Sequence, residues 1–206
     1  MSGVSLLKAV VANATAPVRL QEMEPEESVP ALRRGEVDIA IGHAYDLVPR
    51  DLPVGCERHD LLADPVAAVL PLTDPLHDPR QLSGVVELAQ LGDRPWVLPL
   101  PGTACYELIQ RACGAAGFVP RAVAHCSDFA AVLALVGAGA GVSLVPRLAT
   151  GSSAQDAALH PMVRPVTRSV YALTRRGTDR HPAVRVVLDH LITAAAQMEG
   201  QGRDTT

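Results

Sequence analysis

The sequence lacks any long apolar run. No stretch approaches the roughly 18 uninterrupted apolar residues that a membrane-spanning helix needs. The short apolar run near the start carries Lys8 inside it rather than a basic segment before it, so a signal peptide ending at 12–14 is the weaker alternative. We therefore expect a cytoplasmic protein.

The sequence also lacks an excess of basic residues, and its cysteines lack the short paired spacing of a zinc site. The formal net charge is -4 and the pI is about 5.9, whereas a duplex-binding surface needs a concentrated excess of Lys and Arg. This chain alone is not expected to bind DNA. Its four cysteines show no CxxC spacing, so we predict free thiols and no zinc site at Cys56, Cys105, Cys113 and Cys126.

Catalytic motifs are missing as well: there is no GxSxG, no HExxH and no phosphate-binding loop. The GAGAG at 137–141 follows a helical pattern and precedes a strand, which is the reverse of a dinucleotide site. Cys105 is the best nucleophile candidate, because a position in the first turn of a helix lowers a thiol pKa, but no base accompanies it. His125 and Cys126 point to opposite faces of a strand. We expect no catalytic residue, metal or cofactor.

Strand patterns alternate with helical patterns along the chain. Residues 18–23 alternate apolar and polar side chains, which predicts a half-buried strand. A helix from about Pro25 ends at Gly35, and 37–42 then read as a buried parallel strand. This order is typical of a βαβ unit in an α/β sheet. The pattern predicts further strands at 65–72, 95–100, 141–146 and 169–175, and helices that begin at Thr103, at Ser127 with Asp128, and near His181.

The order and spacing of these segments resemble the effector-binding domain of LysR-type transcriptional regulators over nearly the whole chain. The resemblance rests on ALRRGEVDIAIG, DPVAAVLPLTDPLHDP, RPWVLPLPGTA, RACGAAGFVP, SDFAAVLALVGAGAGVSLVPRLA and SVYALTRRGTDRHPAVRVVLDHL. It implies an α/β, two-lobed fold like type 2 periplasmic binding proteins, in which 65–72 and 169–175 are crossing hinge strands. Lobe I would comprise 1–66 and 172–198 and lobe II 67–171, followed by a flexible tail at 199–206.

The resemblance also implies a function and partners. The chain would be a non-enzymatic sensor that binds a small anionic metabolite between its lobes and so controls transcription. It would reach DNA only through an N-terminal winged helix-turn-helix that this chain does not contain. In the family, the first strand of the sensing domain usually ends in a serine just before the first helix. If Ser2 matches that serine, the first strand of lobe I is missing too. The chain would form a homodimer or a higher homo-oligomer, with the helices near 4–14 and 128–136 at the dimer surface. The alternatives are a free-standing solute-binding protein for a transporter, and an enzyme that uses a Cys105 thiolate.

The candidate ligand site lies where strands end and helices begin, because helix N-termini present unpaired N–H groups there. Taken alone, Ser2, Thr103 and Ser127 are typical N-caps. The resemblance instead favours an effector carboxylate at Ser2 and Thr103. His43, at the end of its strand, could pair with an acidic effector because its pKa lies near neutrality. The predicted ligand-binding residues are Ser2, Gly42, His43, Pro101, Gly102, Thr103, Ala104 and Ser127.

Overall fold

The structure is a computed structural model that describes residues 17–23, 25–76, 84–150 and 156–203. The predicted helix near 4–14 and the candidate Ser2 lie outside these residues. The described helices and strands are α2 (Pro25–Arg34), β1 (Ile39–Tyr45), β2 (Cys56–Pro71), β3 (Pro95–Pro99), α3 (Ala104–Ala115), β4 (Arg121–Cys126), α4 (Phe129–Gly137), β5 (Ser143–Pro146), β6 (Ala157–His160), β7 (Val166–Arg175) and α5 (Pro182–Arg203), with short 3-10 turns at Leu88–Leu91, Arg147–Ala149 and Thr178–Arg180.

The chain divides into two units. Unit 1 holds Tyr45–Pro49 and Asp64–Arg168, and unit 2 holds the described residues up to Ala44 together with Arg50–Ala63 and the chain from Ser169. β2 and β7 each run from one unit into the other, and the strand order of the larger sheet is β1-β7-β2-β5, with β6 also paired to β2. In the described part of the chain, no helix is both long and apolar enough to cross a membrane.

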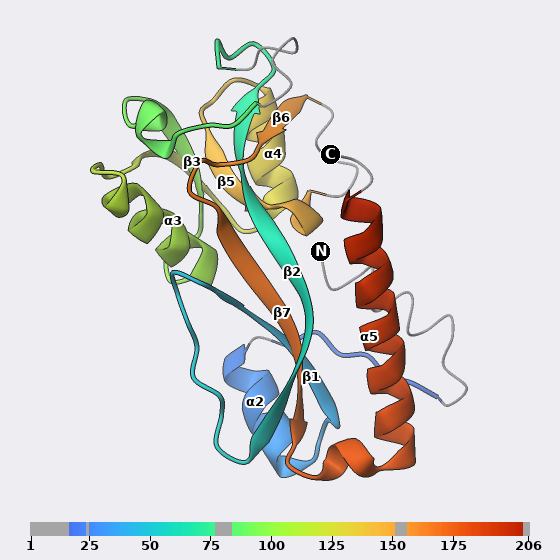
Figure 1. The fold of residues 1–206 in the computed structure, drawn as a ribbon. Helices are drawn as coiled ribbons and strands as arrows, with labels where there is room; N and C mark the ends of the chain where they lie inside the picture. Colours follow the sequence, from blue (N-terminus) through green and yellow to red (C-terminus); the bar gives the residue numbers. More distant parts are fainter. Residues whose placement is uncertain (1–16, 24, 77–83, 151–155, 204–206) are drawn as a thin grey trace. The chain divides into compact units, whose positions relative to one another are not determined.

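Unit 1 is built around strands whose two faces are covered by different helices (Figure 1). β2 pairs antiparallel with β5 and β6, and β3 pairs parallel with β4. Because successive side chains of a strand point to opposite faces, Trp96 and Leu98 pack in the cluster that contains α3 residues, whereas Val97 packs in the cluster that contains α4 residues. Leu144 and Val145 of β5 divide in the same way. Strands β3 and β5 therefore pack against a hydrophobic core on both of their faces.

The predicted glycine-rich segment before β5 has a packing role. A Cβ on Gly141 would lie 2.4 Å from the Pro95 carbonyl oxygen, a distance that no side chain can occupy. The Val142 amide donates to that same oxygen at 2.9 Å, and the Val97 amide donates to the Val142 carbonyl at 2.9 Å. Gly141 is thus needed for the close approach of two backbones, which explains the motif without a nucleotide.

In unit 2, α2 begins and ends where the sequence predicts. Glu26 and Glu27 occupy its first turn, and Gly35 with φ +79° follows its last residue. The side chain of Arg175 then donates to the Leu32 and Val37 carbonyls at 2.8 and 2.7 Å, which ties the end of α2 to β7. The core of this unit gathers Leu32, Ala40, Ala44, Cys56, Tyr171 and Leu173.

Three element predictions need correction. The prediction of a strand at 18–23 is wrong. Residues 17–23 pair with no described strand and so form none, and most of them are exposed. The strand predicted at 37–42 begins later, at Ile39, and it is half-buried at the edge of the described sheet rather than fully buried. α5 continues to Arg203, into part of the segment predicted as a flexible tail.

Candidate functional site

The first candidate region is the corner between β3 and α3 in unit 1. Thr103 caps α3: its hydroxyl oxygen accepts from the Tyr106 amide at 3.2 Å, while the hydroxyl donates to the Leu100 carbonyl at 2.8 Å. Pro101, Gly102 and Thr103 are all exposed. Gly102 has φ +86° and nothing within 4 Å of an added Cβ, so this turn favours glycine and leaves open space in front of the helix.

The geometry of this corner suits an anion at the backbone. A helix supplies no acceptor for its first amides, so those of Ala104 and Cys105 point out of the N-terminus, where the dipole favours negative charge. Because the Thr103 hydroxyl already serves Leu100 and Tyr106, it must turn away from the Leu100 carbonyl to bind an anion. An anion at this corner would therefore have the amides as its primary donors, with Thr103 beside them.

Ser127 lies at the same edge, but it does not cap its helix. The parallel register places Pro99 opposite Cys126, and the Leu100 amide donates to the Cys126 carbonyl at 3.1 Å, so the two turns are neighbours. Asp128, not Ser127, is the N-cap of α4 and accepts from the Ala131 amide at 2.8 Å. A carboxylate is the stronger acceptor for an N-terminal amide, and its charge makes this side of the edge less suitable for an anion.

Cys105 has none of the features of a nucleophile. It is buried, and burial raises the pKa of its thiol to about 11, although a hydrogen bond with Tyr45 opposes the shift. The expected lowering by the helix dipole is therefore wrong in direction, since loss of water around the thiolate outweighs it. All four cysteines are free and buried, which confirms the free thiols expected from the sequence. Among the described residues, no group of three potential ligands could hold a metal ion.

The second candidate region is a cavity of about 270 Å³ in unit 2, beside the first half and middle of β1. β1 continues to Tyr45, so the expectation that His43 lies at the end of its strand is wrong. Two of the predicted site residues, Gly42 and His43, line it together with residues from the start of α2, the loop before β2, and β7. Its full lining is Met23, Glu26, Ser28, Val29, Ala40, Ile41, Gly42, His43, Arg50, Asp51, Pro53, Tyr171 and Leu173.

Tyr171 forms a fixed wall of this cavity. A Cβ on Gly42 would lie 2.9 Å from the Tyr171 ring, so only a glycine lets the ring pack so closely. The guanidinium of Arg58 stacks over the same ring, 4.1 Å from its centroid, and the Tyr171 hydroxyl donates to the His43 carbonyl at 3.5 Å. Gly42 therefore shapes the cavity through Tyr171.

Sequence reasoning singled out Gly42 and His43 but not the charged residues or the aromatic ring that line the same cavity. Glu26 lies at a helix start, where an acidic residue is explained by the helix dipole alone. Arg50 and Asp51 lie in a loop without a recognisable pattern. Tyr171 sits on a strand more than a hundred residues away in sequence. Only its position within the predicted hinge strand at 169–175 could have suggested a role.

Comparisons with known proteins agree with the fold. A family model described as the LysR substrate binding domain matches residues 14–196. The C-terminal domain of a probable LysR family regulator from Rhodococcus sp. RHA1 is 26% identical over 91% of this chain and 90% of its own, with a TM-score of 0.73. HinK, a LysR family regulator from Pseudomonas aeruginosa, is 18% identical over 95% of this chain, with a TM-score of 0.76. The effector binding domain of BenM, solved with its effector benzoate, is 20% identical over 96% of this chain and 86% of its own, with a TM-score of 0.74.

This chain matches nearly all of some solved domains but only part of longer LysR family chains. This chain spans 90% of the Rhodococcus domain but only 65% of HinK. No curated protein sequence matches it significantly. Since the family model covers most of its length, the chain belongs to the LysR substrate binding domain family, with the type 2 periplasmic-binding-protein-like α/β fold and the effector-sensing role that the sequence resemblance implies.

Proposed function

We propose that this chain is a non-enzymatic sensor that binds a small effector carrying an anionic group, and that in a whole regulator this binding controls an attached DNA-binding domain. The observation that carries the proposal is the unit 2 cavity, because it brings together Gly42 and His43, two residues singled out from the sequence as ligand contacts. Family membership supports the same role, and benzoate, the effector of BenM, is itself a small carboxylate.

The α3 corner is proposed as a contact for the anionic group. The first amides of α3 are open to it, and Thr103 is exposed beside them. Pro101, Gly102, Ala104 and Ser127 are proposed as its surroundings, with Ser127 the weakest because of the neighbouring Asp128 carboxylate.

A panel of small carboxylates and amino acids, screened by thermal shift, tests the sensing role. With the best binder, Thr103→Val should weaken binding by about 1 to 3 kcal/mol in calorimetry, through loss of a charge-assisted hydrogen bond and of the helix cap. Thr103→Ser, which keeps the hydroxyl, should bind like the parent. Equal affinity of the valine variant and the parent would refute the corner, and the absence of any stabilising compound would refute the sensing role.

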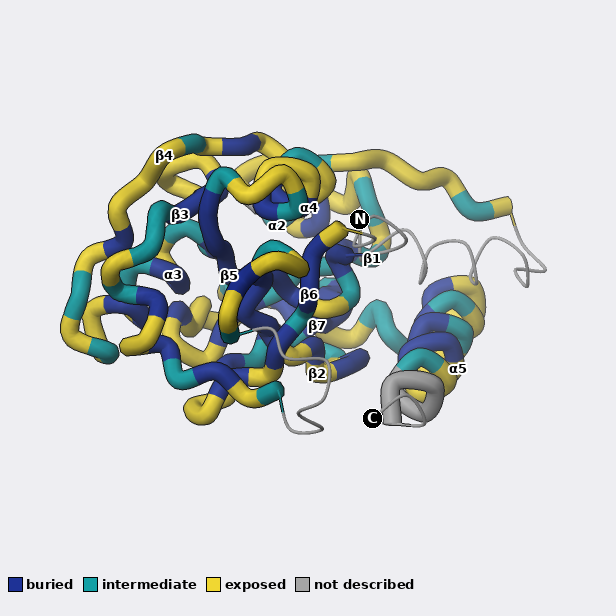
Figure 2. The backbone as a smooth tube through the Cα atoms, turned by 90° about the horizontal axis from the view of Figure 1, so that it is seen from above, coloured by how far each residue is buried: buried dark blue, intermediate teal, exposed yellow. Residues whose placement is uncertain are grey.

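We also propose that the chain forms homodimers. β4 is exposed along most of its length, with Val123 53% accessible, and Val119 beside it is 80% accessible (Figure 2). The neighbouring α4 exposes Leu135 as well. An exposed strand edge with apolar side chains is a site for self-association. Sedimentation equilibrium should show a dimer that Val123→Glu weakens, whereas a monomer at all concentrations would contradict this.

The rival functions have less support. An enzyme built on Cys105 would need an accessible thiolate, and this thiol is buried with a raised pKa. A solute-binding protein for a transporter shares the fold, but the matching family model is that of a transcription regulator domain. A regulator of this kind works in the cytoplasm, which is the location we propose.

A further inference from the structure

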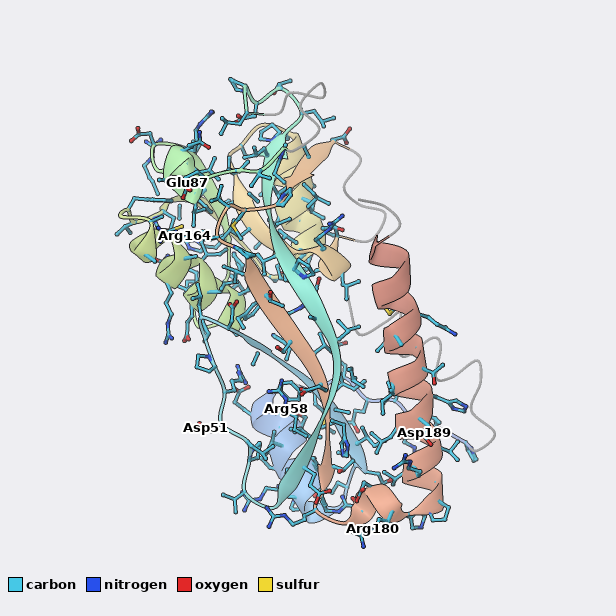
Figure 3. The ribbon with its side chains drawn as sticks, viewed as in Figure 1. Asp51, Arg58, Glu87, Arg164, Arg180 and Asp189 are labelled. Carbon is cyan, nitrogen blue, oxygen red and sulfur yellow. The ribbon has the colours of Figure 1, made fainter. Side chains whose placement is uncertain are left out.

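The cavity in unit 2 carries charges of both signs at its rim. Arg50 and Asp51 come from the loop before β2, and Glu26 comes from the first turn of α2. Figure 3 shows Asp51 on that loop and Arg58 on β2. All three rim residues are exposed, so their charged groups keep their water and are available to a ligand.

These three charged groups do not neutralise one another. The ion pairs found among the described residues join other partners, and none involves Arg50, Asp51 or Glu26. Arg58, by contrast, is engaged by Asp60 and by the Tyr171 ring. The rim thus offers one guanidinium and two carboxylates, and its own charges sum to about -1, so a ligand with a negative charge alone would meet net repulsion.

Most of the rest of the lining is apolar, and Ser28 and His43 are its polar members. Val29, Leu173 and the Tyr171 ring are side chains suited to a hydrocarbon group. A cavity of about 270 Å³ lies just below the usual range for small-molecule sites, roughly 300 to 1,000 Å³. This volume suits a metabolite rather than a peptide.

We infer that this cavity binds a zwitterion with an apolar body, such as an aliphatic or aromatic α-amino acid. Its ammonium group would lie against Asp51 and Glu26, its carboxylate against Arg50, and its side chain against Tyr171 and Leu173. Arg binds a carboxylate through two parallel hydrogen bonds, and a carboxylate pair suits a compact ammonium. The inference rests on the proposed sensing function, adds a second charge to the effector, and assigns the carboxylate to Arg50 in place of the α3 corner. Amino-acid binding that Thr103→Val weakens and Arg50→Gln leaves unchanged would overturn this placement.

Two sets of ligands that differ only in charge test it on the whole chain. One set is L-phenylalanine, 3-phenylpropanoate and 2-phenylethylamine, and the other is L-leucine, 4-methylpentanoate and 3-methylbutylamine. In calorimetry, at least one amino acid should bind about tenfold or more tightly than both of its single-charge analogues, since each analogue leaves one rim charge unmatched.

Variants that each remove one rim charge show which rim residue contacts which charged group of the ligand. Asp51→Asn and Glu26→Gln should each weaken amino-acid binding severalfold and should strengthen binding of the carboxylate analogue, because each change removes a repelling charge. Arg50→Gln should weaken the amino acid and the carboxylate analogue alike. Glu27→Gln is the matched control, because Glu27 lies next to Glu26 on α2 but does not line the cavity. Circular dichroism of each variant checks that it is folded.

The outcomes separate this inference from the proposed function. A carboxylate analogue that binds as tightly as its amino acid would overturn the zwitterion and leave sensing of an anion intact. The same holds if neither amino acid binds but another carboxylate of the panel does. Amino-acid binding that Asp51→Asn, Glu26→Gln and Glu27→Gln affect equally would also overturn it. If no compound in the panel binds, both the inference and the sensing function fail.

Discussion

Asp64 and Arg168 form a buried ion pair in unit 1, and removing one partner should strongly destabilise the fold. Asp64 begins the part of β2 in unit 1, and Arg168 ends the part of β7 there. The Arg168 Nε and Nη2 atoms donate to Asp64 Oδ2 at 3.0 and 2.5 Å, and the Leu148 amide donates to Oδ1 at 3.0 Å. Both side chains are nearly inaccessible, at 7% for Arg168 and 0% for Asp64.

The magnitude follows from desolvation. Burial raises the pKa of the Asp64 carboxyl, against the opposing attraction of Arg168, so the pair is held at a cost in lost hydration. Asp64→Ala would leave the guanidinium buried without the carboxylate that balances its charge, which costs about 3 to 5 kcal/mol. This is a large part of the roughly 5 to 15 kcal/mol that stabilises a domain. The double change Asp64→Leu with Arg168→Leu should recover much of the loss, because it buries no charge.

Urea unfolding followed by circular dichroism measures these free energies. The control is Glu36→Gln, which removes an exposed pair with Arg34 that contributes little. If Asp64→Ala were no more destabilising than Glu36→Gln, or if the double change were as damaging as the single one, the reasoning about buried charge would be refuted.

Two further predictions concern Gly42 and Cys105. Gly42→Ala should destabilise the chain by about 1 to 3 kcal/mol in urea unfolding, because its methyl group overpacks the Tyr171 ring; Gly114→Ala, in open helical space, should be neutral or stabilising, and equal effects would contradict the close contact. The raised pKa of Cys105, about 11 against an ordinary 9.0, means that folding favours the protonated thiol. This contribution is complete below the unfolded pKa near pH 9 and is lost as the pH rises through about 11. The free energy of unfolding should therefore fall more steeply between pH 8 and 11 in the parent than in Cys105→Ala, and parallel slopes would disprove the shift.

Local signals in the sequence located most elements. α2 follows from Glu26 and Glu27 at one end and Gly35 at the other, and α3 follows from Thr103 as its cap. These boundaries are fixed by backbone groups within a few residues, so the sequence contains all the information that they need. The family could be identified for the same reason, since it rests on the order of such elements along the chain.

Strand pairing and side-chain burial depend on residues that lie far apart in the sequence. The alternation at 18–23 predicts a strand, yet a strand exists only where another strand pairs with it, and among the described residues none does. Likewise the dipole at the start of α3 predicts a lowered pKa for the Cys105 thiol, but burial raises that pKa. A sequence shows which groups a residue carries and not how much water remains around it.

For the candidate site, the sequence by itself determined that Thr103 caps the start of α3, and it predicted Gly42 and His43 as ligand contacts although both lie in the middle of β1. Only the tertiary structure brought Tyr171 against Gly42 and set Arg50, Asp51 and Glu26 around one cavity. The physical reason is that N–H groups at a helix end are properties of the local backbone, whereas a cavity is formed by side chains from segments that the fold alone makes neighbours.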